Sequence, residues 1–116
     1  MLVYLAGGLR TGWQDDVVGV RVLDPRTWQD HDPAVYTARD LAALRGCDAV
    51  LAYMDASNPS GFGLSLEVGY AHALGKPIAF VDAMGCDPRA RYFAMLREIA
   101  QVFTDIGAAT AWLKGL

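Results

Sequence analysis

The sequence predicts an α/β fold: a single domain over residues 1–116, built on a doubly wound parallel sheet of five strands. Short apolar runs alternate with longer segments of helical periodicity along the whole chain. One run, Ala49–Tyr53, is apolar on both faces, as in a central parallel strand that helices cover on both sides. Hydrophobic residues make up 53% of the 116 residues and charged residues 20%, enough for a sizeable core in one domain.

The strands are predicted by short apolar runs that end at turn-forming residues. Gly7 and Gly8 end the first run, and the turn at Asp24–Arg26 ends the second. The expected strands are Leu2–Ala6, Val20–Leu23, Ala49–Tyr53, Ile78–Val81 and Val102–Phe103.

The helices are predicted by apolar periodicity and by stop signals. Leu41 and Leu44 share one face of the first helix, and Gly75 with Pro77 ends the second. The expected helices are Thr37–Arg45, Leu64–Leu74, Arg89–Ala100 and Ala108–Lys114.

Right-handed crossovers between successive parallel strands lead to a flavodoxin- or Rossmann-like sheet of order 2-1-3-4-5. Such sheets bind ligands outside the carboxyl ends of their strands, near the switch point between strands 1 and 3. The ligand-binding loops are therefore expected at residues 7–13, 24–28 and 54–63.

Composition excludes several classes of partner. The net charge is −3 and no long basic run is present, which argues against a nucleic acid polymer. No apolar stretch reaches the roughly 20 residues of a membrane helix. Cys47 and Cys86 lie far apart, and neither they nor the two histidines have metal-ligand spacing. We expect a reduced, cytoplasmic protein without a metal or other cofactor.

Glu67 is the main catalytic candidate. It follows a glycine-rich loop at the predicted ligand edge and lies in or near the first turn of a helix with apolar residues all round, which predicts a buried helix. A carboxylate at a helix start commonly just stabilises the helix dipole. A buried carboxylate without a role is costly, however, and an ionised one in a cleft suits nucleophilic attack on a sugar carbon. We expect the helix N-terminus to outweigh burial and keep Glu67 ionised.

Asp40 has two interpretations. With Thr37 as N-cap it fits a capping box, which is a structural role. Beside the pocket, its carboxyl group would instead give a proton to a departing base.

The remaining substrate-binding candidates lie in the three ligand-edge loops. Glycines allow close approach of the backbone to a ligand. Arg10 either holds a phosphate or lies in solvent, and Asp24 belongs to an ordinary turn at the ligand edge. No GxGxxG pattern follows the first strand, so a dinucleotide cofactor of the Rossmann type is not expected. His72, within the second helix, is expected to be a core residue. The glycine candidates are Gly7, Gly8, Gly61 and Gly63.

The segment 58–77 contains a glycine-rich turn, then Glu-Val-Gly-Tyr-Ala, then Gly-Lys-Pro. It resembles the nucleoside 2-deoxyribosyltransferase family. Val3–Gly7 is similar to that family's opening strand and loop, and Asp40–Asp48 to its helix leading into strand 3. The resemblance covers most of residues 1–82. It implies a homodimer or larger oligomer that acts on a small-molecule nucleoside or nucleotide.

The resemblance also implies roles for individual residues. Glu67 matches the nucleophile that forms a glycosyl-enzyme intermediate, and Asp40 matches an aspartate near the departing base. Ser60 and Arg10 match phosphate-binding positions of the related deoxynucleoside-monophosphate N-glycosidases. Ala94 departs from the pattern, since the family has an asparagine or serine there. Three hypotheses remain: a transferase or hydrolase of nucleosides, a hydrolase of nucleoside 5′-monophosphates, and a nucleotide-binding sensor without turnover.

Overall fold

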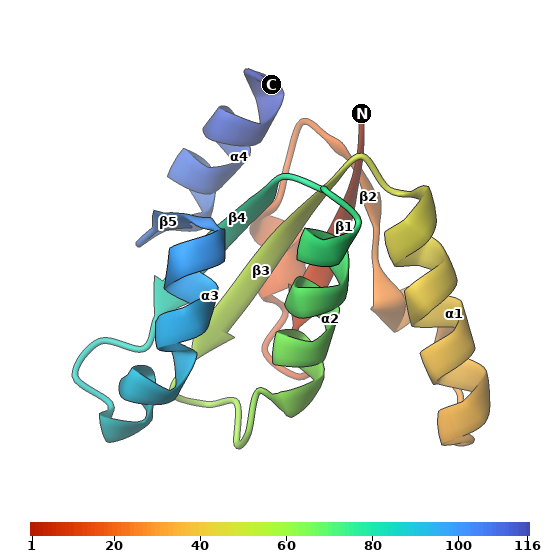
Figure 1. The fold of residues 1–116 in the computed structure, drawn as a ribbon, viewed down its shortest axis with the longest axis horizontal. Helices are drawn as coiled ribbons and strands as arrows, with labels where there is room; N and C mark the ends of the chain where they lie inside the picture. Colours follow the sequence, from red (N-terminus) through yellow and green to blue (C-terminus); the bar gives the residue numbers. More distant parts are fainter.

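The computed structural model describes residues 1–116 and shows a five-stranded, all-parallel sheet of order β2-β1-β3-β4-β5 (Figure 1). The predicted fold class and strand order are confirmed. The strands are β1 Leu2–Gly7, β2 Arg21–Leu23, β3 Ala49–Asp55, β4 Ile78–Ala83 and β5 Gln101–Phe103.

Helices cover both faces of the sheet and enclose two separate apolar clusters. On one face, α1, α2 and α3 pack over Tyr4, Val50 and Phe80; on the other, α4 and η1 pack over Val3 and Leu51. The α-helices are α1 Pro33–Gly46, α2 Phe62–Ala73, α3 Ala94–Ile99 and α4 Ile106–Lys114. The 3-10 helices are η1 Trp13–Asp16, η2 Pro25–Trp28 and η3 Pro88–Phe93.

Two helix predictions are wrong in their starting points. Helix α1 begins at Pro33, where the Asp32 side chain accepts a hydrogen bond from the backbone N–H of Ala34. Thr37 therefore lies inside the helix and cannot cap it. The single helix predicted over Arg89–Ala100 is a 3-10 helix followed by the short α3.

The second helix, predicted to be buried, is buried on one side only within a single chain. Leu64, Val68 and Ala71 face the sheet, but Phe62 is 83% exposed and Leu66 is 60% exposed. His72, predicted to be a core residue, is exposed as well. The sheet covers only one side of α2, so local apolar composition overstated its burial.

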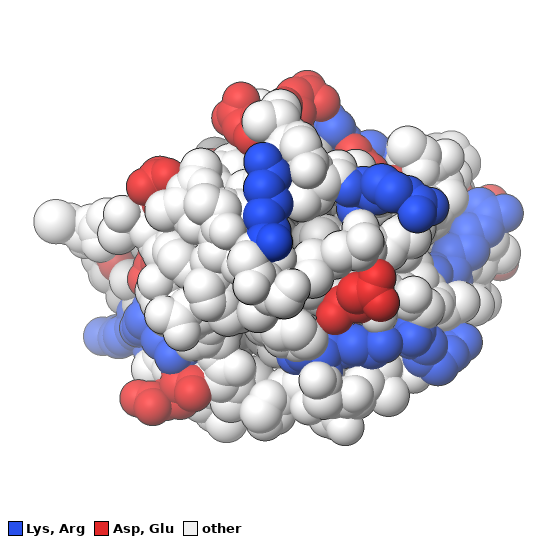
Figure 2. Space-filling view, turned by 90° about the horizontal axis from the view of Figure 1, so that it is seen from above, with Lys and Arg blue, Asp and Glu red and all other residues white.

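The charged surface is mixed. Figure 2 views the molecule from the end opposite the carboxyl ends of the strands, and there Lys and Arg side chains lie among Asp and Glu. No helix has both the length and the apolar character that crossing a membrane requires.

Candidate active site

A cavity of about 200 Å³ opens at the carboxyl ends of β1 and β3, at the predicted switch point, and we call it the Glu67 cavity. The strands, the loops that follow them and three helices contribute to its wall. Its lining residues are Tyr4, Leu5, Gly7, Gly8, Leu9, Pro25, Asp40, Asn58, Ser60, Gly61, Gly63, Leu64 and Glu67.

Glu67 enters this cavity from the second turn of α2, one turn later than expected. The helix begins after Gly61, which has a left-handed φ of 75°. A Cβ atom at Gly61 would lie 2.6 Å from the ring of Phe93, so only glycine allows the loop to pack against η3. Gly61 therefore fixes where α2 starts and which of its residues faces the cavity.

The pKa of Glu67 is raised from its ordinary value of 4.5 to about 7. Burial is the largest cause; the hydrogen bond from Tyr4 acts in the opposite direction, and the nearby charge of Asp40 raises the pKa further. The expectation that the helix N-terminus would outweigh burial is wrong, because Glu67 lies beyond the first turn, where free N–H groups are found.

Tyr4 is the partner of Glu67 and was not among the predicted site residues. It lies in the middle of β1, is fully buried, and its hydroxyl donates a hydrogen bond to Glu67 Oε2. Burial, together with the adjacent carboxylate, raises the pKa of Tyr4 far above its usual range. Tyr4 therefore stays a neutral donor, which favours the ionised form of Glu67. The signal in the sequence was a hydroxyl group inside an otherwise apolar strand.

Asp40 reaches the same cavity from the middle of α1. Its Oδ1 accepts a 2.8 Å hydrogen bond from the indole nitrogen of Trp28 in η2. Burial raises the pKa of Asp40, and this hydrogen bond only partly opposes the shift. Asp40 is not the N3 residue of a capping box, because α1 begins at Pro33. Asp40 is therefore a half-buried carboxyl group beside Glu67, and Trp28 orients it.

Gly7 and Gly8 line the Glu67 cavity where the chain leaves β1 toward η1. A Cβ atom at Gly7 would lie 2.6 Å from the carbonyl oxygen of Tyr53 and 2.9 Å from the ring of Trp13. The carbonyl oxygen of Gly8 accepts hydrogen bonds from the indole of Trp13 at 2.7 Å and from the side-chain amide of Gln14 at 3.0 Å. These contacts hold the loop backbone against the cavity.

The loop between β3 and α2, which contains Ser60, is held by Arg89 from η3. The guanidinium group of Arg89 donates to the carbonyl oxygen of Asn58 at 2.5 Å and to that of Ala56 at 2.7 Å. Asp87 accepts further hydrogen bonds from the same group and orients it. Sequence patterns gave no sign of this contact, because it joins segments more than 30 residues apart.

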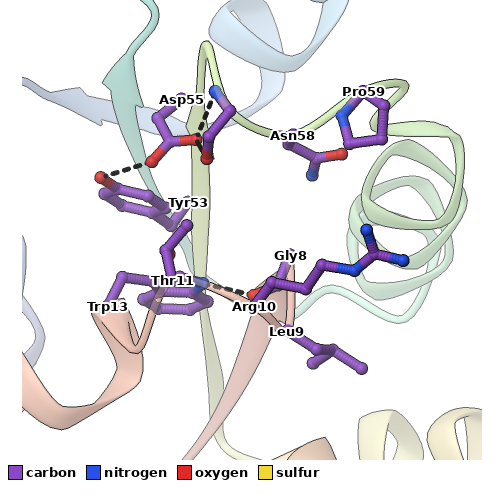
Figure 3. A pocket seen from close by; sticks show the side chains of 10 residues that line it. Gly8, Leu9, Arg10, Thr11, Trp13, Tyr53, Asp55, Asn58 and Pro59 are labelled. Carbon is purple, nitrogen blue, oxygen red and sulfur yellow. Dashed lines mark hydrogen bonds between the residues drawn. The ribbon is translucent and has the colours of Figure 1, made fainter.

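Two predicted binding residues lie outside the Glu67 cavity. Arg10 lines a second, adjoining cavity of about 330 Å³, the Trp13 cavity, which Figure 3 shows. The carboxylate of Asp24 accepts three hydrogen bonds from Arg26 and caps η2, and Asp24 lines neither cavity. The structure thus brings together Glu67, Asp40, Ser60 and the four glycines.

Comparison with known proteins identifies one family and a set of similar solved structures, two of which follow. The model of the nucleoside 2-deoxyribosyltransferase family matches residues 23–88. A 2-deoxyribosyltransferase from Bacillus psychrosaccharolyticus is 18% identical, with a TM-score of 0.73 over 95% of this chain and 90% of that chain. The CMP N-glycosidase BcmB of Clostridium botulinum is 20% identical, with a TM-score of 0.65 over 98% of both chains. At these identities the two structures show a shared fold. No curated protein matches the chain.

Proposed function

Because the chain belongs to the nucleoside 2-deoxyribosyltransferase family, we propose that it cleaves the N-glycosidic bond of a nucleoside or nucleotide, with Glu67 as nucleophile. The observation that supports this most directly is the Glu67 cavity. In it the carboxyl group of Glu67, which accepts a hydrogen bond from Tyr4, lies beside the carboxyl group of Asp40. Both similar structures are of enzymes that act on nucleosides or nucleotides. Residues 1–116 act as one domain in this proposal.

In the first step, an ionised oxygen of Glu67 bonds to C1′ of the sugar while the bond between C1′ and the base nitrogen breaks. The electron pair of that bond leaves with the base. Asp40 gives a proton to the departing base, and the burial that raises its pKa favours the protonated form this step needs. The products of this step are the free base and a sugar esterified to Glu67.

In the second step, an acceptor attacks C1′ and releases Glu67 as a carboxylate. Asp40, now ionised, takes the proton of the acceptor and returns to its starting state. Water as acceptor makes the reaction a hydrolysis, and a second base makes it a transfer. Adding a second base to the assay therefore separates these two activities.

A nucleoside 5′-monophosphate is the second candidate substrate. The observation that favours it is Arg10, whose guanidinium group makes no ion pair in the structure and which lines the adjoining Trp13 cavity. Ser60 lines the Glu67 cavity, together with Asn58, which lines both cavities. A phosphate between Arg10 and Ser60 would be bound by a cation and a hydroxyl group.

We also propose that the protein acts as a homodimer in the cytoplasm. Four large apolar side chains are exposed on neighbouring helices: Phe62 and Leu66 of α2, Tyr92 of η3 and Met95 of α3. Covering them with a second copy would remove this apolar surface from water. The two cysteines are unpaired, as is usual in a reducing compartment. Light scattering at micromolar protein should give twice the monomer mass, and a monomer would contradict the dimer.

The test of the function is release of free base from a panel of nucleosides, deoxynucleosides, their 5′-monophosphates and NAD. We expect turnover of at least one member, and none with Glu67→Ala. A 2-fluoro-2-deoxy nucleoside should leave a sugar attached to the peptide that contains Glu67, visible as a mass increase. Turnover that survives in Glu67→Ala would refute the mechanism. If the native protein releases no base, the sensor without turnover replaces the enzyme.

A further inference from the structure

The Trp13 cavity is larger than the Glu67 cavity, with about 330 Å³ against about 200 Å³, and the two share a wall. The wall consists of Gly8, Leu9 and Asn58, which line both. A Cβ atom on Gly8 would lie 3.4 Å from the side-chain nitrogen of Asn58, so these two residues of the wall are close together. A phosphate alone leaves most of the larger cavity empty, since pockets of about 300 Å³ and more hold whole organic ligands.

Which part of a substrate would lie in each cavity follows from the proposed function, on which this inference rests. Asp40 lines only the Glu67 cavity, and Arg10 lines only the Trp13 cavity. With the base at Asp40 and C1′ at Glu67, the far side of the sugar ring points away from Asp40. In a furanose, C4′ and its substituent C5′ are on that far side. The 5′ substituent of a substrate is therefore directed over Gly8 and Asn58, toward the Trp13 cavity.

The Trp13 cavity is lined by two charged side chains of opposite sign. Arg10 and Asp55 lie on opposite sides of the cavity (Figure 3). Burial raises the pKa of Asp55, but hydrogen bonds from Ser57 and Tyr53 outweigh it, and the net pKa lies below the usual range. Asp55 is thus an anionic acceptor, suited to an amino group, while Arg10 is suited to a phosphate.

Between these charges the wall is aromatic and aliphatic. The half-buried ring of Tyr53 stacks at 4.9 Å and 14° on Trp13, which is itself 4% exposed, and Leu9 and Pro59 add apolar surface. The hydroxyl of Tyr53 donates a 3.2 Å hydrogen bond to Asp55 Oδ2, which keeps the ring in place. A flat heterocycle with amino groups matches this combination of apolar walls and an anionic acceptor.

We propose that the Trp13 cavity binds a second nucleobase, joined to the substrate through its 5′-phosphate, so that the preferred substrate is a dinucleotide. The phosphates lie at Arg10, the second base contacts the apolar walls, and its amino group donates to Asp55. The first nucleoside occupies the Glu67 cavity and loses its base there.

The experiment compares three substrates that share one base: the nucleoside, its 5′-monophosphate and the symmetrical dinucleoside 5′,5′-diphosphate, in adenine and cytosine sets. We expect kcat/KM for the dinucleotide to exceed that for the monophosphate by about tenfold or more, as one base–aromatic contact provides. Thr11→Trp fills the Trp13 cavity from an exposed position and should bring this ratio near one. Thr104→Trp, at another exposed threonine that lies outside both cavities, should keep the ratio of the native protein.

A ratio near one in the native protein would overturn the proposal, as would a ratio that Thr11→Trp leaves unchanged. Calorimetric binding of the dinucleotide keeps this result separate from the proposed function. If no base is released but the dinucleotide binds and Thr11→Trp abolishes binding, the cavity assignment holds and the glycosidic activity fails. If the dinucleotide neither reacts nor binds, the assignment of the Trp13 cavity is wrong.

Discussion

Replacing Glu67 with glutamine should make the protein more stable at alkaline pH. The pKa of Glu67 is about 7 in the folded protein, against an ordinary value of 4.5, because the side chain is buried. Between these values the folded state holds a proton that the unfolded state has lost. Stability therefore falls as pH rises from about 4.5 through about 7. Glutamine has a similar shape, accepts the hydrogen bond of Tyr4 and never ionises.

The shift from 4.5 to about 7 corresponds to about 3 kcal/mol at pH 8, where Glu67 is ionised. At pH 4.5 and below, both side chains are neutral in the folded protein, so the two proteins should differ little. For a chain of this length, 3 kcal/mol corresponds to roughly 10 °C in melting temperature.

Urea or thermal unfolding of both proteins, followed by circular dichroism between pH 4.5 and 8, measures this difference. The matched control is Glu98→Gln, which changes the other glutamate of the chain, an exposed one on α3. The effect of Glu98→Gln on the free energy of unfolding should not vary with pH in this way. If Glu67→Gln changes stability by the same amount at pH 5 and pH 8, burial does not set the charge of Glu67, and the reasoning fails.

Four further predictions concern catalysis. Asp40→Asn should slow kcat by about 10²- to 10⁴-fold, as expected for a lost proton donor, and an unchanged kcat would exclude that role. Tyr4→Phe removes a hydrogen bond that favours ionised Glu67, so the rise of kcat/KM with pH should move to higher pH. Arg10→Ala should weaken monophosphate binding by about ten- to a hundredfold, measured as Kd against that of the free nucleoside; equal losses would make Arg10 structural. Arg89→Met should raise KM more than Arg97→Met does. Arg97 is the control because it has similar exposure but contacts Asp82 and Ala90. Equal effects would show that holding the loop between β3 and α2 is unimportant.

The fold was predictable because alternating short apolar runs and helical segments leave few arrangements of a parallel sheet. The errors lie where distant segments meet. The 3-10 geometry of η3 accompanies contacts of Arg89 with Asn58 and of Phe93 with Gly61, and local periodicity contains neither. The start of α1 was missed for a local reason, since Asp32 followed by proline is itself a helix-start pattern.

The site was predictable in part for a similar reason. Glu67 and the glycines lie in or after loops that follow strands ending at one edge of the sheet, and the sequence shows this directly. Asp40 lies in the middle of α1, and only the family resemblance indicated its role. Tyr4 lies within a strand, and its importance depends on a hydrogen bond across 63 residues. Whether burial or the helix N-terminus dominates the pKa of Glu67 depends on whether Glu67 lies in the first or the second turn of α2. Sequence patterns do not resolve a helix start that finely.

The lack of space at Gly7 has a consequence for how such a site can evolve. Any larger residue there would collide with the backbone of Tyr53, so this position has no freedom to vary. Two side chains further along the loop, Arg10 and Thr11, are exposed and line only the Trp13 cavity. Mutation can alter their size and charge without moving Tyr4 or Glu67. Substrate preference can therefore drift among descendants of one ancestor while the bond-breaking chemistry is inherited unchanged.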